Sequence, residues 1–203
     1  MLRKQKIMAA EKELTHEESI RIIQSMIQTA KSRITENGFH FLLWGVLVIA
    51  ASLGQYVWLG QGGGNETNLV WMLMPAIGVP AAFVYEWRAD KNKQVRTHLD
   101  SFYGFIWLGF GIALGLIIYT ALRMHTQTLP FILIITGLAT FVSGCLFRFK
   151  PLIAGGIVFW VACVASSFIS PYNQLLLNAA ATFLGYIVPG VLLWQNYKRE
   201  NNV

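Results

Sequence analysis

The sequence has little charge, and long stretches of it have none. Only 13% of its 203 residues are charged, whereas 55% are hydrophobic and the mean hydropathy is +0.49. Soluble domains typically carry about 25% charged residues. This composition excludes an ordinary soluble globular protein, and we expect most of the chain to lie in lipid.

Cysteine and histidine are also scarce, which excludes several kinds of site. Cys145 and Cys163 stand in apolar runs without a CxxC or Cys/His spacing, and the four histidines are dispersed at or beyond the ends of those runs. Metal and redox sites need such side chains close together. We therefore expect no metal, no cofactor and no catalytic constellation, and we predict that the protein is not an enzyme.

Six apolar stretches are long enough to cross a membrane. A spanning helix needs roughly 20 mostly apolar residues, and a spanning barrel would require alternation at period two, which is missing here. None of the stretches contains Lys, Arg, Asp or Glu. The sequence thus predicts an all-α polytopic membrane protein with six transmembrane helices, at residues 39–59, 69–85, 102–122, 129–147, 152–169 and 175–194.

Small residues and prolines inside these stretches predict how the helices pack. Helices in lipid approach each other closely where small residues recur on one face, and proline removes a backbone hydrogen bond and bends a helix. The even-numbered spans also end alike, with an aromatic residue beside a basic one, which fits three tandem hairpins. The packing pairs are Gly111 with Gly115, Gly137 with Gly144 and Ala181 with Gly185, and the prolines are Pro75, Pro80 and Pro189.

The basic residues are distributed unevenly between the two sides of the membrane. Of the 16 Lys and Arg residues, 15 lie before the first span, in alternate connections or after the last span, and Arg123 alone lies on the other side. Cytoplasmic connections carry the excess of positive charge. We therefore predict a multi-pass protein of the bacterial inner membrane with both termini in the cytoplasm. The charge stands in short blocks, so we expect no nucleic-acid partner.

The segment before the first span, residues 1–38, reads as a separate amphipathic helix. Thr15 and Glu18 form a capping-box pattern, and Asn37 followed by Gly38 supplies a stop signal. Between them apolar residues recur every three or four positions, and the rest of the helix is too polar to span. We expect this helix to be cytoplasmic or to lie at the membrane surface.

Three partners are compatible with this organisation. The first is the lipid bilayer, which would surround a membrane domain at residues 39–197 and contact the apolar stripe of the preceding helix. The second is a cytoplasmic protein that docks on residues 15–36. The third is another copy of the chain. Residues 198–203 form a short cytoplasmic tail.

Uncharged polar residues provide the candidate functional site. On the last and fourth spans they are spaced so that they share one helix face, and two more lie on the first span. They could hydrogen-bond between helices or line a small polar cavity that opens outward. The residues are Asn178, Thr182, Tyr186, Thr136, Thr140, Ser143, Ser52 and Gln55.

Several stretches resemble a known family. The carboxy-terminal part of the chain is similar to the end of six-helix inner-membrane proteins common in Bacteroidota, in the stretches RFKPLIAGGIVFWVACVASSF, from Arg148, and YNQLLLNAAATFLGYIVPGVLL. The segment before the first span and its entry, THEESIRIIQSMIQTAK and FLLWG, are similar to the beginning of the same proteins. The resemblance implies a six-helix inner-membrane protein. It implies no activity, because none is assigned to that family.

Two functions follow as hypotheses. The first is a non-enzymatic membrane protein that senses, scaffolds or regulates through its cytoplasmic surface. The second is a permease that passes a small neutral solute without coupling, because coupled transport needs a titratable group inside the membrane and the apolar stretches contain no charged residue. In a permease the polar residues named above would line the path.

Overall fold

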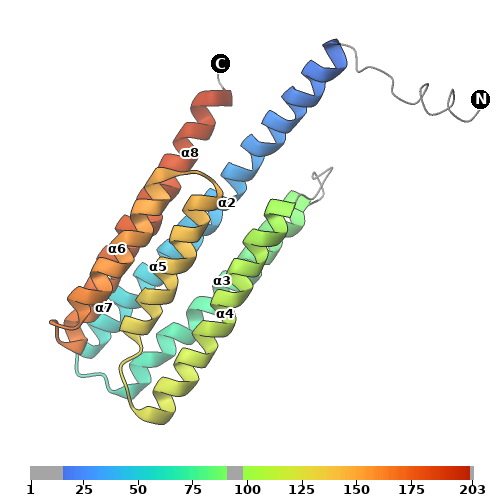
Figure 1. The fold of residues 1–203 in the computed structure, drawn as a ribbon. Coiled ribbons are helices and arrows are strands. Elements are labelled where there is room, and N and C mark those ends of the chain that lie inside the picture. Colours follow the sequence, from blue (N-terminus) through green and yellow to red (C-terminus); the bar gives the residue numbers. More distant parts are fainter. Residues whose placement is uncertain (1–15, 91–97, 202–203) are drawn as a thin grey trace, which may run out of the picture.

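The computed structural model describes residues 16–90 and 98–201, and the side chains of residues 38–88 and 101–195. Every element within these ranges is a helix, and no strand occurs in them (Figure 1). The all-α class is confirmed. In chain order the elements are α2 (His16–Gly60), the 3-10 turn η1 (Asn65–Asn68), α3 (Leu69–Asp90), α4 (His98–Met124), α5 (Leu129–Leu146), α6 (Lys150–Ser166), α7 (Pro171–Thr182), the π-helical segment η2 (Phe183–Ile187) and α8 (Val188–Asn201).

Five helical segments of the described chain are long and apolar enough to cross a membrane. The sixth apolar helix, α6, has 17 residues, which corresponds to about 26 Å at 1.5 Å per residue and is close to the 30 Å of a hydrocarbon core. These features are consistent with the predicted polytopic bundle. The five longer segments are Gly38–Gly60, Asn65–Arg88, Ser101–Met124, Leu129–Leu146 and Pro171–Gln195.

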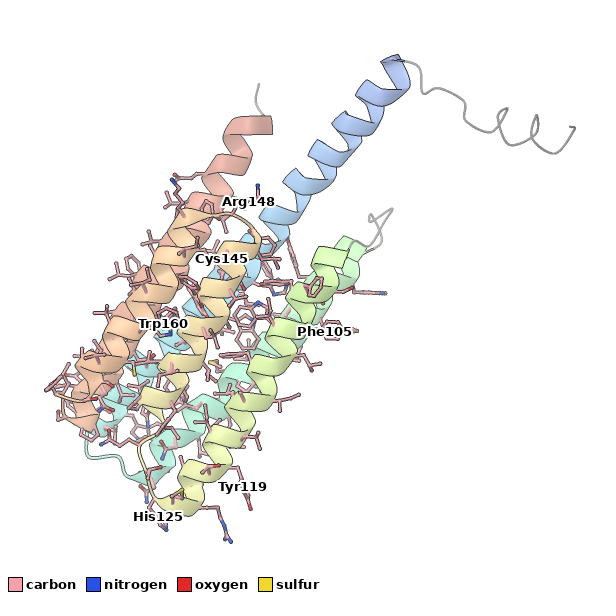
Figure 2. All side chains as sticks on the ribbon, viewed as in Figure 1. Phe105, Tyr119, His125, Cys145, Arg148 and Trp160 are labelled. Atoms are coloured by element: carbon pink, nitrogen blue, oxygen red, sulfur yellow. The ribbon has the colours of Figure 1, made fainter. Side chains whose placement is uncertain are left out.

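The connections between helices alternate between the two ends of the bundle. Arg148, between α5 and α6, lies at one end, and His125, between α4 and α5, lies at the other (Figure 2). Arg88, at the end of the second candidate span, and Lys150, at the start of α6, share the end of Arg148. We call this end the basic end and the opposite one the far end.

The helix before the first span is continuous with that span, contrary to our prediction. α2 runs without interruption for 45 residues through Asn37 and Gly38, and its amino-terminal part projects beyond the other helices at the basic end (Figure 1). Gly38 is buried, and a Cβ added there would lie 3.4 Å from the Leu193 Cβ. Gly38 therefore lies at a contact between α2 and α8 and does not end the helix.

The helices do not pack equally. α5 and α6 form the most extensive contact, while α2 packs against α7, η2 and α8 on one side and against α3 on the other. Thus the closest pair joins two of the predicted hairpins and does not lie within one. α4 packs mainly on α5, and α3 mainly on α2. The core side chains come from α2, α5, α6 and the last span, and are Phe41, Leu133, Leu152, Phe159, Ala162, Ala181, Tyr186 and Leu193.

The predicted bend at Pro189 takes the form of a change in helix type. Residues Phe183–Ile187 are π-helical and lie directly before the turn that contains Pro189. Proline has no N–H to donate to the carbonyl four residues earlier, and local π-helical adjustments can satisfy the backbone groups that it frees. By contrast, Pro75 and Pro80 lie inside α3, which remains a single helix.

Candidate functional site: the buried polar residues

All eight polar residues of the predicted site are buried. Their side chains are at most 8% exposed, with Thr136 the most exposed and Ser52, Thr140 and Ser143 completely covered. They come from α2, from α5 and from the last span. They do not converge on one point, and their hydrogen bonds divide them into separate groups.

The first group joins the first and last spans. The Asn178 amide Nδ2 donates a hydrogen bond of 2.9 Å to the Ser52 Oγ, across 126 positions of sequence. Both side chains are buried. An uncharged polar pair in lipid is stabilised by such a bond because neither group can find water there. This contact is the interhelical hydrogen bond that the sequence suggested.

The second group holds the start of α3 against α2. Gln55 accepts a hydrogen bond of 2.6 Å from the Trp71 indole Nε1 at its Oε1. Its Nε2 donates to the Asn68 Oδ1 at 2.9 Å and to the Thr67 Oγ1 at 3.3 Å. Gln55 therefore does not take part in the Asn178 group. It fixes the turn between α2 and α3.

The hydroxyl groups of α5 bond within their own helix. The Thr140 Oγ1 donates to the Thr136 carbonyl at 2.6 Å, and the Ser143 Oγ donates to the Ala139 carbonyl at 2.7 Å. Such bonds to the carbonyl four residues earlier satisfy a hydroxyl without a partner helix. The close approach of α6 occurs at Gly137 and Gly144 of the same helix, where an added Cβ would meet α6 atoms at 2.6 Å.

Tyr186 connects α5 to the centre of the bundle. Its ring lies 5.4 Å from that of Phe41 and 5.1 Å from that of Phe159, measured between centroids. Its hydroxyl faces the Thr140 side chain. Thr182, one turn earlier, is 2% exposed. Both residues thus help to pack three helices together.

Sequence reasoning missed one member of the polar stripe on the last span. Gln174 is 5% exposed, and its Nε2 donates to the Ser166 carbonyl and to the Gln127 Oε1, both at 2.9 Å, and to the Ile169 carbonyl at 3.2 Å. It therefore ties α7 to two connections at the far end. The signal was present, because Gln174 precedes Asn178 by four positions and continues the same spacing.

A second cluster lies at the basic end, between α2 and α3. The rings of Phe39 and Tyr85 stack with centroids 3.8 Å apart and an angle of 13° between their planes. Next to them the His40 Nε2 lies 3.3 Å from the Glu86 Oε1. The sequence placed His40 outside any site because the four histidines are dispersed along the chain. Its acidic partner, Glu86, comes from α3 and is close only in the folded structure.

Two hollows flank this aromatic stack. One has a volume of about 510 Å³ and is lined by Phe39 and by one face of α3 that ends at Arg88. The other has about 240 Å³ and reaches Trp194 of α8. Phe39 and Tyr85 line both hollows, so the stack forms the wall between them.

Neither the described side chains nor comparison with known proteins indicates a metal site or a related protein. Within the described residues, no group of three or more His, Cys, Asp or Glu side chains could hold a metal ion. Comparison of the chain with protein-family models, curated proteins and solved structures gave no significant match.

Proposed function

We propose that this chain is a multi-pass protein of the bacterial inner membrane that senses, scaffolds or regulates through a cytoplasmic surface at its basic end, without catalysing a reaction. The observation that carries the proposal is the continuity of α2. At 1.5 Å per residue its 45 residues extend about 68 Å, well beyond a bilayer of about 45 Å including headgroups. One rigid element thus connects the buried core to the outside of the bundle.

The contacts of α2 support such a connection. Within the bundle α2 packs on the last span and on α3. Its Ser52 side chain bonds to Asn178 of the last span, and its Gln55 side chain bonds to Trp71 of α3. A change in the packing of these helices would therefore shift α2 and move its projecting part. The resemblance to six-helix inner-membrane proteins of Bacteroidota supports the same location, and membership of that family stays a prediction.

Truncation and helix breaking test the proposal in cells. A biotin ligase fused to the carboxy terminus would label neighbouring proteins in the full chain, in a chain that lacks residues 1–36 and in Asn37→Pro. Proline inside a helix costs about 3 kcal/mol or more, so this variant should interrupt α2. We expect both changes to remove specific neighbours while the protein still inserts into the membrane. An unchanged set of neighbours in both variants would contradict the proposal.

The orientation has its own test. Single cysteines at Asn65 and Asn92, in a variant in which Cys145 and Cys163 are replaced, would be treated with an impermeant thiol reagent on the outside of intact cells. We expect the reagent to reach Asn65→Cys, between α2 and α3, and not Asn92→Cys, because the basic connections should be cytoplasmic. The reverse pattern would invert the arrangement.

The permease hypothesis is weakened by the use that the protein makes of its polar residues. Asn178 of the last span bonds to Ser52 of α2, and Gln55 of α2 bonds to the start of the second span. Two α5 hydroxyls bond to their own backbone. A proteoliposome swelling assay with a panel of neutral solutes decides the matter. A solute-specific response that is lost in Asn178→Leu combined with Thr182→Val, with folding preserved, would establish transport.

A further inference from the structure

The larger hollow at the basic end has the chemistry of a lipid site. Its wall is formed by positions of α3 separated by one, three or four residues, which therefore share one face, and by the Phe39 ring of α2. The lining residues are Phe39, Pro80, Ala81, Val84, Tyr85 and Arg88. Apart from the Tyr85 hydroxyl and the Arg88 guanidinium, these side chains are apolar.

The polar groups of this groove are confined to one end. Arg88 closes the second candidate span and lies two turns, about 12 Å, from Pro80 along α3. Tyr85 lies close to it on the same face. The groove is therefore apolar along the part that would face hydrocarbon and cationic where the headgroups begin, which matches the division of a phospholipid.

The charges around the groove favour an anionic headgroup. Glu86, the neighbouring acid, pairs with His40 of α2 at 3.3 Å. Among the described side chains, residues 38–88 and 101–195, no carboxylate pairs with Arg88, whose side chain is exposed. Arginine binds phosphate with two parallel hydrogen bonds, and basic pockets between transmembrane helices at the cytoplasmic side recognise anionic headgroups.

The groove lies on the outer surface of the bundle, where lipid is the neighbour. Val84 is 43% exposed, and Pro80 and Arg88, one turn or more to either side of it on α3, are exposed as well. We propose that this groove binds one anionic phospholipid of the leaflet at the basic end, with its phosphate at Arg88 and an acyl chain against Ala81 and Phe39. The proposal depends on the membrane location and not on the regulatory role.

Native mass spectrometry of the delipidated protein in detergent tests the headgroup. Phosphatidylglycerol and phosphatidylcholine with identical acyl chains would be added at equal concentration. We expect the first bound lipid to favour phosphatidylglycerol about fivefold, as one basic residue near anionic lipid contributes about 1 kcal/mol. Arg88→Gln should abolish this preference, Arg88→Lys should keep part of it, and Arg123→Gln, at the far end, should keep all of it.

A second pair of variants tests the acyl chain. Ala81→Phe fills the hollow and should reduce occupancy by both lipids, whereas Met72→Phe, exposed on the same helix nearer the far end, should not. Thermal unfolding of each variant checks that the bundle is intact. Glycerol 3-phosphate, which has no acyl chain, should not displace the bound lipid at tenfold excess.

Three results would overturn the proposal. The first is wild-type lipid preference in a folded Arg88→Gln protein. The second is an equal loss of preference in Arg123→Gln, which would indicate general attraction to the protein surface. The third is displacement by glycerol 3-phosphate, which would make Arg88 a phosphate contact only.

Discussion

Helices α4 and α6 both contain glycines, but the surroundings of these glycines differ. A Cβ added at Gly155 of α6 would stand 2.6 Å from the Gly185 carbonyl oxygen, and one added at Gly156 would stand 2.8 Å from the Gly137 carbonyl oxygen. The same addition at Gly111 or at the other glycines of α4 meets nothing within 4 Å. Small residues therefore mark tight packing only where a second backbone is present.

The difference extends to the large side chains. Phe105 and Tyr119 of α4 point away from the bundle (Figure 2) and are 68% and 63% exposed. Trp160 of α6 instead lies against α5, where its indole Nε1 donates to the Ile134 carbonyl at 3.2 Å. The bundle thus consists of a tightly packed part, α2 with α5 to α8, and two outer helices, α3 and α4.

The largest effect should come from adding a methyl group in the tight part. Gly155→Ala would press its Cβ against the Gly185 backbone, which cannot turn aside as a side chain can. Overpacking of this kind costs typically about 1–3 kcal/mol, so we expect a lower unfolding temperature in detergent, followed by tryptophan fluorescence. Ala154→Leu, an exposed neighbour on α6, is the control. Equal stability of Gly155→Ala and wild type would show that the two backbones can separate freely.

A smaller and local effect should follow from loosening α3. Gln55→Leu removes three hydrogen bonds to the start of this span, each worth about 0.6 kcal/mol in a membrane protein. We expect faster hydrogen exchange in α3 and unchanged exchange in α5 and α6, measured by mass spectrometry. Gln61→Leu, at an exposed position of the following turn, should change neither. A rise throughout the bundle would mean that α3 is not an outer element.

The pair between the first and last spans should show a measurable coupling. In a double-mutant cycle of Ser52→Ala and Asn178→Ala, we expect a coupling free energy of about 0.6 kcal/mol and at most about 1.7 kcal/mol, as for other membrane hydrogen bonds. The control cycle combines Ser52→Ala with Thr140→Val, whose hydroxyl bonds to its own helix, and should give a value near zero. Equal couplings in the two cycles would argue against a specific contact.

The smallest effect should come from a methyl group on α4. Gly115→Ala meets no neighbour, and alanine favours a helix over glycine by up to about 1 kcal/mol, so we expect unchanged or slightly higher stability. Gly137→Ala, whose Cβ would lie 2.6 Å from the Trp160 ring, should be destabilising in the same assay. Loss of a dimer in Gly115→Ala, detected by light scattering, would instead show that a second copy covers α4.

The positions of the spans could be read from the sequence with few errors. Backbone polar groups have no water to bond with in lipid, so a long apolar run must satisfy them within a helix. The first predicted span, 39–59, and the fourth, 129–147, differ from the apolar helical segments by at most one residue at each end, whereas 69–85 and 175–194 begin four residues later than theirs. That the polar residues of the last span share one helix face also followed, because a four-residue spacing places side chains on one face.

Which helix each face packs against, in contrast, was decided by the tertiary structure. Helical spacing gives a face but not the neighbour that covers it, so Gly111 with Gly115 and Gly137 looked alike although only Gly137 packs against another helix. Asn37 with Gly38 resembled a stop for the same reason, since the close approach of Leu193 appears only once α8 lies beside α2. The composition of this chain determined that its backbone forms apolar helices. Contacts between residues far apart in sequence determined which of their faces meet.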